Sequence, residues 1–579
     1  MEDLLSLIPV KLFFIISTFF IWKYLLQKGK TLQQPFISRW ALGFAFLSIV
    51  LSVVSLEKVY PYGATTDLLA FAVMCSIVMA LPTQNVFGKT LAVILFSLFL
   101  LGPLLYISHY LIVGGPINKD SFTSVFQTTN NEAFEYLASF TSVSSVLPII
   151  IFFGLAVWII KRDTTEERQA LNVKSAFFVS ILSLFLIVIS PIERGLFTYP
   201  VNSFISYKKD IDTIQKRLKE FSERDTLSYE AIKKERGEMY IVVIGESLNK
   251  HHMGIYGYEE NTTPMLSQLV ADNELLVVKN SFSNYPRTVP ALSHALTQAN
   301  QKNHKIALDS VGLLNVMNQA HFNTYWIGNQ PLSTSYDMSL GLIAKEAKHV
   351  ELAFDAKFTS TRIGEQKPDE ILLPLIDQAL SEVSSGDNTI IFVHLSGNHT
   401  DYCNRYPAEY KKYEVSGIKS LWMHLFKGGP GRSRECYDNS IIYNDFVVSS
   451  IIKKLKEVLS DEKIGGLIYF ADHADDVTRG GHSSANFSYD MIESPMMAWF
   501  SPAYRDQRPL KTAAYMSNMD KYYPNDFIFD TVIGMTKTDV SQNVYCSTCD
   551  LFNSEYVLPL EAAKTMHGKL PYNPVNLAL

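Results

Sequence analysis

The sequence lacks three features, and each absence excludes a class of protein or site. Lys and Arg number 51 against 57 Asp and Glu, so a net charge of −6 gives no reason to expect nucleic acid as a partner. Only one CxxC motif occurs, at Cys546 and Cys549, and no second pair completes a four-cysteine zinc site. No small-residue cleavage site follows the first apolar stretch, which argues against a removable signal peptide.

Apolar residues are concentrated in the first 190 positions, and the rest of the chain is typical of a soluble α/β domain. A chain of 579 residues is too long for one core, so we expect at least two domains. Any single apolar stretch could be a buried helix, but six in succession with charged loops favour membrane spans. Three of them are short and need flanking residues to span. The stretches cover residues 9–26, 40–56, 64–81, 91–113, 146–160 and 176–189.

Basic residues occupy alternate loops between these stretches. Such loops face the cytoplasm, so residue 30 is predicted to be cytoplasmic and residue 570 to lie on the opposite, extracytoplasmic side of the membrane. Reporter fusions at the two positions test this, and finding both on one side would refute it. The extracytoplasmic compartment is oxidising, which makes cysteine pairs beyond the spans disulfide candidates. The loop residues are Lys28, Lys30, Arg39, Lys89, Lys161, Arg162, Arg168 and Lys174.

Two connecting segments have helical spacing. The outside loop at 114–145 contains an amphipathic stretch that could lie on the membrane, cover the active site or pack between spans. The charged segment 206–236 is predicted to form a bridging helix.

Two short apolar runs, at 239–245 and 466–471, are typical of strands buried on both faces. The first ends at Glu246 and the second at Asp472 and His473, where open α/β sheets place their ligands. A carboxylate after one strand is usually a cap or a solvated loop residue. Two strand ends that deliver Glu, Asp and His together indicate half of a divalent-metal site.

A hydroxyl and two histidines follow other predicted elements. Thr288 precedes VPALSHALT, which predicts a helix with Thr288 as its N-cap. Beside a metal, such a hydroxyl could become a nucleophile. His399 lies beyond the strand IIFVHL, and His482 lies in a glycine-rich loop, whereas His394 falls within the strand and is expected to pack there.

Five blocks resemble the bacterial phosphoethanolamine transferases, inner-membrane enzymes of the alkaline phosphatase/sulfatase superfamily, and occur in that family's order. They are GESLNKHHMGIYGYEENTTP, RTVPALS, VHLSGNHTDYCNRYP, YDNSIIYNDFVVSSIIKKL and YFADHADDV. The membrane half is similar too, including FQTTNNEAFEYL. The resemblance implies a multi-span α-helical membrane domain at 1–192, a bridging segment at 193–237 and a periplasmic three-layer αβα domain at 238–579.

The resemblance also implies a zinc site and a reaction. Glu246, Asp472 and His473 would bind zinc, and Thr288 would be both ligand and nucleophile. His399 and His482 would hold the phosphoryl group or a second zinc. Phosphatidylethanolamine would be the donor, and the acceptor would be a lipopolysaccharide core heptose, a lipid A phosphate or another surface glycan. A covalent phosphothreonine would link the two half-reactions.

The chain departs from the family in several places. Ala474 and Asp475 stand where members often have Gly and Glu, and we count six spans where members have five. No cysteines flank Thr288, unlike in members that modify lipid A, and RTVPALSHALT and IYNDFVVSS look closer to members acting on the core. Two alternatives stay open: a related phosphoglycerol transferase or phosphodiesterase/sulfatase-type hydrolase, and a non-catalytic membrane binding protein.

The four cysteines after the spans suggest two disulfides. Cys403 and Cys436 flank a polar insert at 404–435 and are predicted to pair. Cys546 and Cys549 are predicted to form a small structural disulfide.

Overall fold

The computed structural model describes most of the chain beyond residue 229. The described ranges are 203–209, 211–213, 229–330, 338–353, 367–382, 386–426, 430–459, 462–479, 481–482 and 487–574, together with a few isolated residues. Within them, no helix is long and apolar enough to span a bilayer. The six predicted spans and the amphipathic stretch at 114–145 lie outside the described residues, apart from isolated positions.

A seven-stranded sheet forms the centre of the compact unit that contains residues 210–579. Six strands run parallel, and β9 is antiparallel to both of its neighbours. The order across the sheet is β3 (Leu275–Val278), β9 (Met496–Phe500), β8 (Gly465–Ala471), β2 (Met239–Gly245), β7 (Thr389–His394), β5 (Asn323–Gly328) and β6 (His349–Leu352).

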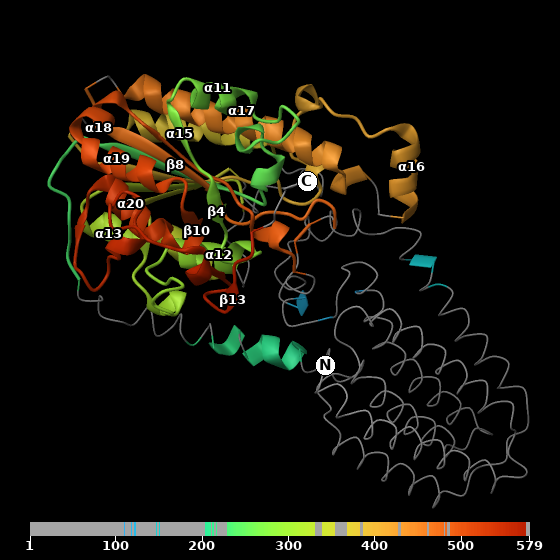
Figure 1. Ribbon diagram of the computed structural model, residues 1–579, viewed down its shortest axis with the longest axis horizontal. Helices are drawn as coiled ribbons and strands as arrows, with labels where there is room; N and C mark the ends of the chain where they lie inside the picture. Colours follow the sequence, from blue (N-terminus) through green and yellow to red (C-terminus); the bar gives the residue numbers. More distant parts are fainter. Residues whose placement is uncertain are drawn as a thin grey trace, which may run out of the picture. The chain divides into compact units, whose positions relative to one another are not determined.

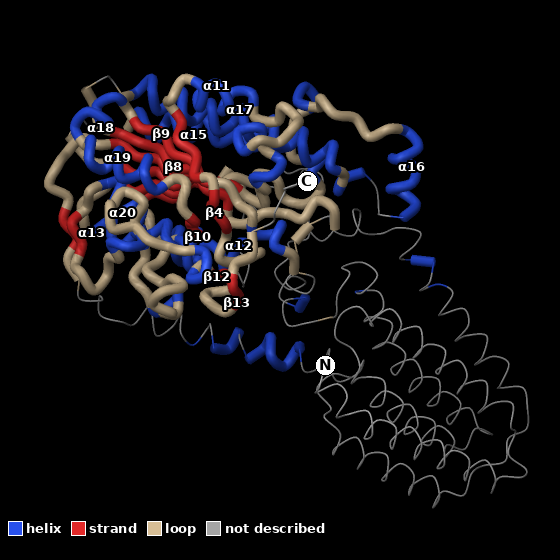
Figure 2. The backbone as a smooth tube through the Cα atoms, in the orientation of Figure 1, coloured by secondary structure: helices blue, strands red, loops and turns tan. Residues whose placement is uncertain are grey.

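Helices cover both faces of this sheet, and Figures 1 and 2 show the three layers. Every residue of β2 and β8 is buried, which explains why both read as continuous apolar runs. Successive side chains of β2 point to opposite faces of the sheet, and each face has its own hydrophobic core. On one face, Tyr240 and Val242 pack with residues of α12 (Thr288–Ala295), α13 (Leu313–Gln319) and α20 (Ile528–Thr536). On the other face, Ile241 and Val243 pack with residues of α11 (Pro264–Ala271), α15 (Leu372–Ser381) and α17 (Arg434–Val458). The predicted three-layer α/β fold of the catalytic half is therefore confirmed.

The segment predicted as a bridging helix is only partly helical. Residues 203–209 and 211–213 are in helix. Ala231–Ile232, however, forms the strand β1, which pairs with β11 (Asp539–Val540). The prediction of a helix as far as residue 236 is wrong at that end, because pairing with β11 satisfies the backbone groups in extended form.

The structure contains both predicted disulfides, and they close loops of very different length. Cys403–Cys436 spans 33 residues and fastens η6 (Tyr402–Asn404) to the start of α17. Cys546–Cys549 spans three residues. Chain entropy predicts a stabilisation of about 3–4 kcal/mol for the long loop and about 1.5 kcal/mol for the short one.

The double variant Cys403→Ser/Cys436→Ser should therefore lower the thermal midpoint of the α/β domain more than Cys546→Ser/Cys549→Ser. Differential scanning fluorimetry of the full-length protein in detergent compares the two variants. An equal or larger loss in the second variant would contradict the loop-closure account.

Candidate active site and metal centre

Two adjacent parallel strands bring the central carboxylates together. β2 and β8 pair in register from Met239 with Gly465 to Gly245 with Ala471. Glu246 and Asp472 follow directly after the last pair, so they leave the sheet side by side at its carboxyl edge. Both side chains are buried, with exposed fractions of 1% and 0%. This edge is where an open α/β sheet places its ligands.

Neighbouring residues pack closely against the backbone on both sides of Glu246 and fix the conformation of the turn after β2. A Cβ on Gly245 would lie 2.0 Å from the hydroxyl oxygen of Tyr469, so only glycine fits there. A Cβ on Gly397 would lie within 3.0 Å of the backbone of Glu246. Ser247 has a φ of +55°, a left-handed conformation that a non-glycine residue adopts at a cost. The surrounding packing therefore holds Glu246 in one place.

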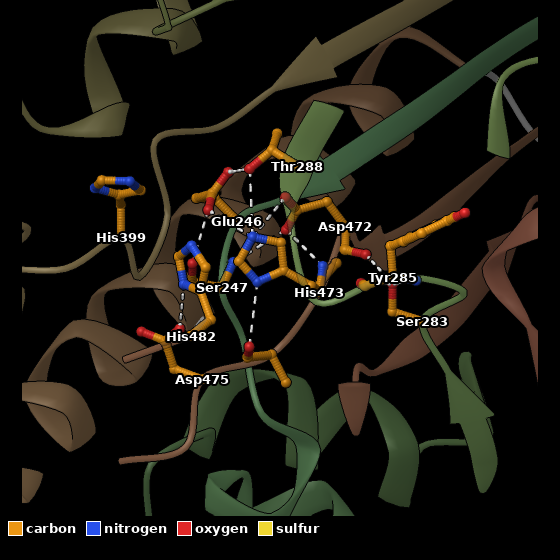
Figure 3. Close-up of polar contacts among 12 residues, drawn as sticks. Glu246, Ser247, Ser283, Tyr285, Thr288, His399, Asp472, His473, Asp475 and His482 are labelled. Carbon is orange, nitrogen blue, oxygen red and sulfur yellow. Dashed lines mark hydrogen bonds and ion pairs between the residues drawn. The ribbon is translucent and has the colours of Figure 1, made fainter. Parts of the chain in front are cut away.

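Four side chains meet within hydrogen-bonding range at this edge, as Figure 3 shows. Nε2 of His473 lies 3.4 Å from Oε1 of Glu246 and 3.2 Å from Oδ2 of Asp472. The Thr288 hydroxyl donates to Oε2 of Glu246 at 3.2 Å and lies 3.3 Å from Nε2 of His473. The structure thus brings together all four residues expected at the zinc site.

Thr288 is not the N-cap of its helix, so that prediction is wrong by one residue. Arg287 is the cap, in extended conformation, and Thr288 is the first residue of α12. The Thr288 hydroxyl contacts Glu246 and His473 instead. The part-exposed residue lies at the N-terminal end of the helix, where the helix dipole favours negative charge.

Glu246 and Asp472 are two buried carboxylates side by side, and a bound cation would stabilise their negative charges. Burial raises the pKa of Asp472 well above its usual value, and the neighbouring Glu246 carboxylate raises it further. Burial would also raise the pKa of Glu246, but the imidazoles of His473 and His399 outweigh burial and lower it. Burial lowers the pKa of His473 to about 4, so this imidazole is neutral near pH 7.

A divalent ion fits this donor set. Ligand atoms of Glu246, Asp472 and His473 all lie within 4.8 Å of one another. The buried Oδ2 of Asp472 accepts no hydrogen bond even though Nε2 of His473 lies 3.2 Å away, because Nδ1 of that ring faces the Ala474 carbonyl and Nε2 is then without a proton. A metal ion would satisfy both atoms. Two carboxylates and an imidazole are zinc ligands.

His482 adjoins the same cluster, and His399 lies further out (Figure 3). The rings of His473 and His482 are 4.1 Å apart between centroids, and those of His399 and His482 are 6.3 Å apart. Asp475 orients His482, accepting from Nδ1 at 2.6 Å. Burial opposes the charged imidazole, but the Asp475 carboxylate raises the pKa of His482 overall. His473, Asp475 and His482 form a second set with metal-ligand spacing.

Two residues of the site were not predicted for it. The amide Nε2 of Gln330 donates to Oε2 of Glu246 at 3.1 Å. Gln330 comes two residues after β5, so the strand-end argument that found Glu246 could have found it too. Asp475 was noted only as a departure from the family. It holds both His482 and the hydroxyl of Tyr402, which donates to Oδ2 at 2.7 Å.

Two other groups do not contribute to the centre. His394 ends β7 fully within the core, where burial lowers its pKa to about 4, in line with the expected packing role. Asp530 lies close to Cys546 and Cys549, but the disulfide occupies both sulfur atoms.

Comparison with known proteins places this geometry in a family. The family model described as sulfatase matches residues 238–538, more than half of the chain. Phosphoethanolamine transferase EptC of Escherichia coli O18:K1:H7 (strain RS218 / NMEC) is 26% identical over 518 residues. The alignment covers 82% of this chain and 86% of the relative.

Two solved structures are similar to the protein. The C-terminal periplasmic domain of Escherichia coli EptC in complex with Zn has a TM-score of 0.51 at 26% identity, covering 60% of this chain and 98% of the other. The integral membrane lipooligosaccharide phosphoethanolamine transferase A of Neisseria meningitidis has a TM-score of 0.59 at 19% identity, covering 92% and 97%, and shares the fold. The superfamily predicted from the sequence blocks is confirmed. The chain belongs to the sulfatase family.

Proposed function

We propose that the protein is a zinc-dependent phosphoethanolamine transferase that uses Thr288 as its nucleophile. One observation carries this proposal: the Thr288 hydroxyl contacts both Glu246 and His473, two members of the buried metal-ligand set. The relative that aligns over most of both chains is named a phosphoethanolamine transferase. A similar domain, also of EptC, is titled as a complex with Zn.

Glu246, Asp472, His473 and Thr288 would hold the zinc ion. When bound, the ion would supply positive charge that favours the ionised threonine hydroxyl and polarises a phosphoryl oxygen. Oε2 of Glu246 accepts from this hydroxyl at 3.2 Å and would hold Oγ1 beside the metal.

In the first half-reaction, Oγ1 of Thr288 attacks the phosphorus of phosphatidylethanolamine. The phosphorus–oxygen bond to diacylglycerol breaks, the departing oxygen takes up the proton that the threonine hydroxyl loses, and phosphoethanolamine remains on the threonine. His482, held by Asp475, adjoins the cluster, and both it and His399 further out would bind the non-bridging oxygens. In the second half-reaction, an acceptor oxygen attacks the same phosphorus and regenerates Thr288.

The acceptor and the location belong to the same proposal. The acceptor is a core heptose or a lipid A phosphate of lipopolysaccharide, or another surface glycan. We propose a membrane domain at 1–192, a bridging segment at 193–237 and a periplasmic catalytic domain at 238–579, all anchored in the bacterial inner membrane. A lipid donor makes such an anchor useful.

Mass spectrometry of lipopolysaccharide from cells with and without this protein tests the proposal. We expect phosphoethanolamine on the glycolipid only when the wild-type protein is present, and none with Thr288→Ala. Assays with phosphatidylethanolamine and phosphatidylglycerol separate the related activities. Transfer of phosphoglycerol, or release of a free head group without transfer, would contradict the proposal.

Replacing Asp475 with asparagine should slow transfer without removing the zinc ion held by Glu246, Asp472, His473 and Thr288. Asp475→Asn leaves an amide in place of the carboxylate that holds Nδ1 of His482. Loss of such an orienting group typically costs about 10–100-fold in activity. The control Tyr402→Phe keeps the carboxylate and removes only its other hydrogen bond, so its cost should be smaller. A steady-state transfer assay compares them, and equal costs would refute this role for Asp475.

A further inference from the structure

The disulfide-closed insert at 404–435 carries a helix whose apolar face is exposed. This helix, α16 (Gly417–Phe426), stands apart from the sheet and its covering helices in Figure 1. Ile418, Leu421 and Trp422 are exposed by 87%, 62% and 49%. Their i, i+3 and i+4 spacing places them on one side of the helix.

A helix on the surface of a globular domain normally turns its apolar side toward the core and its polar side toward solvent. In α16 only Met423, among the side chains described, is buried, with an exposed fraction of 5%. Met423 lies roughly 100° around the helix from Trp422. Among the described side chains of α16, the apolar stripe therefore faces outward and only Met423 packs inward, and an exposed apolar stripe is typical of an interaction surface.

The charge of the insert indicates what covers this stripe. Residues 404–435 contain seven Lys and Arg against three Glu, a net charge of +4, although the whole chain has −6. Lys419 in the helix and Lys411 and Lys412 shortly before it are exposed, although Lys411 and Lys419 also pair with Glu414 and Glu435. An exposed apolar stripe with a tryptophan and flanking lysines suits the interface of a bilayer that contains anionic lipids. A second copy of the chain is less suitable, because symmetric pairing would oppose two inserts of the same charge.

We propose that the apolar face of α16 lies in the interfacial layer of an anionic phospholipid bilayer. The insert that would contact the bilayer also reaches the candidate active site at the carboxyl edge of the sheet. A Cβ on Gly481, next to His482, would lie 3.4 Å from Nη2 of Arg432, a residue of the same insert. The Cys403–Cys436 disulfide fastens the base of the insert. The proposal requires no transferase activity, so binding alone tests it.

The experiment uses the full-length protein in nanodiscs of phosphatidylethanolamine and phosphatidylglycerol. In a Cys75→Ser background, Ile418→Cys carries an environment-sensitive fluorophore, and a nitroxide lipid serves as quencher. The matched control is Leu510→Cys on α19 (Pro509–Asn518), because Leu510 is 86% exposed and apolar. An interfacial helix buries its apolar face roughly 5–10 Å, so the label at 418 should emit at shorter wavelength and be quenched. The label at 510 should show neither effect.

A second variant and a second lipid complete the test. Leu421→Asp, added to the labelled Ile418→Cys chain, should reduce the quenching, as should replacing phosphatidylglycerol with phosphatidylcholine. The proposal is overturned if the label at 418 behaves like the label at 510, or if Leu421→Asp has no effect. A blue-shifted label that lipid does not quench would assign the surface to protein, either the chain's own membrane part or a second copy, and would overturn it too.

Discussion

Replacing Thr288 with alanine should abolish transfer, lowering the rate by roughly 10⁴- to 10⁶-fold, the range seen when members of a catalytic unit are removed. The methyl side chain cannot attack phosphorus, and no other described hydroxyl is equivalent. Ser247 donates to Glu246 at 2.7 Å, but it is fully buried, whereas Thr288 is part-exposed and reachable by a lipid head group.

The variant should keep its fold and its metal. Glu246, Asp472 and His473 remain, so zinc measured by atomic emission should stay near the wild-type content. Thr288→Ser is the matched control, because it restores the hydroxyl and should recover part of the activity. Near-normal transfer by Thr288→Ala would show that the catalytic centre is wrongly assigned.

Replacing Asp472 with asparagine should remove metal and activity together. Oδ1 of Asp472 accepts from the backbone N–H groups of Ser247 and His473 at 3.0 and 2.7 Å, and an amide oxygen can keep both bonds. The Oδ2 atom, buried without a hydrogen bond, becomes an NH₂ group that cannot bind zinc. Metal affinity should therefore fall by more than the roughly 10–100-fold typical of residues that only orient ligands.

Thermal unfolding with and without zinc measures this loss. A ligand at 100 times its Kd stabilises a protein by about 2.7 kcal/mol, so zinc should raise the midpoint of the apo wild type. The Asp472→Asn variant should show little rise. Asp476→Asn is the control, since Asp476 is buried in the same loop but bonds to Ser488 and Arg479. A normal zinc response in Asp472→Asn would exclude Asp472 as a ligand.

The site residues that could be predicted best from the sequence are those that directly follow buried strands. The runs ending at Gly245 and Ala471 had to be buried on both faces, and parallel strands end at the same edge, so Glu246 and Asp472 could be placed together. Gln330 obeys the same rule and was overlooked.

Features that depend on loop conformation could not be predicted in this way. The hydrogen bond from Tyr402 to Asp475 joins two residues 73 positions apart in the sequence, and no local pattern indicates it. Threonine is a common N-cap residue, but in the structure Arg287 occupies the N-cap position of α12. Thr288 is one residue further on, and its hydroxyl points into the site. Residues 404–435 were predicted only as a polar insert, so neither the helix α16 nor its exposed apolar side was predicted.

Peptide mapping of the covalent intermediate tests the central claim most directly. The full-length wild-type protein is incubated with phosphatidylethanolamine, without acceptor, and then digested and analysed by mass spectrometry. We expect phosphoethanolamine on Thr288 and no adduct in Thr288→Ala. An adduct on Ser247 or Ser293 instead, or none in protein that is active when acceptor is supplied, would contradict the account.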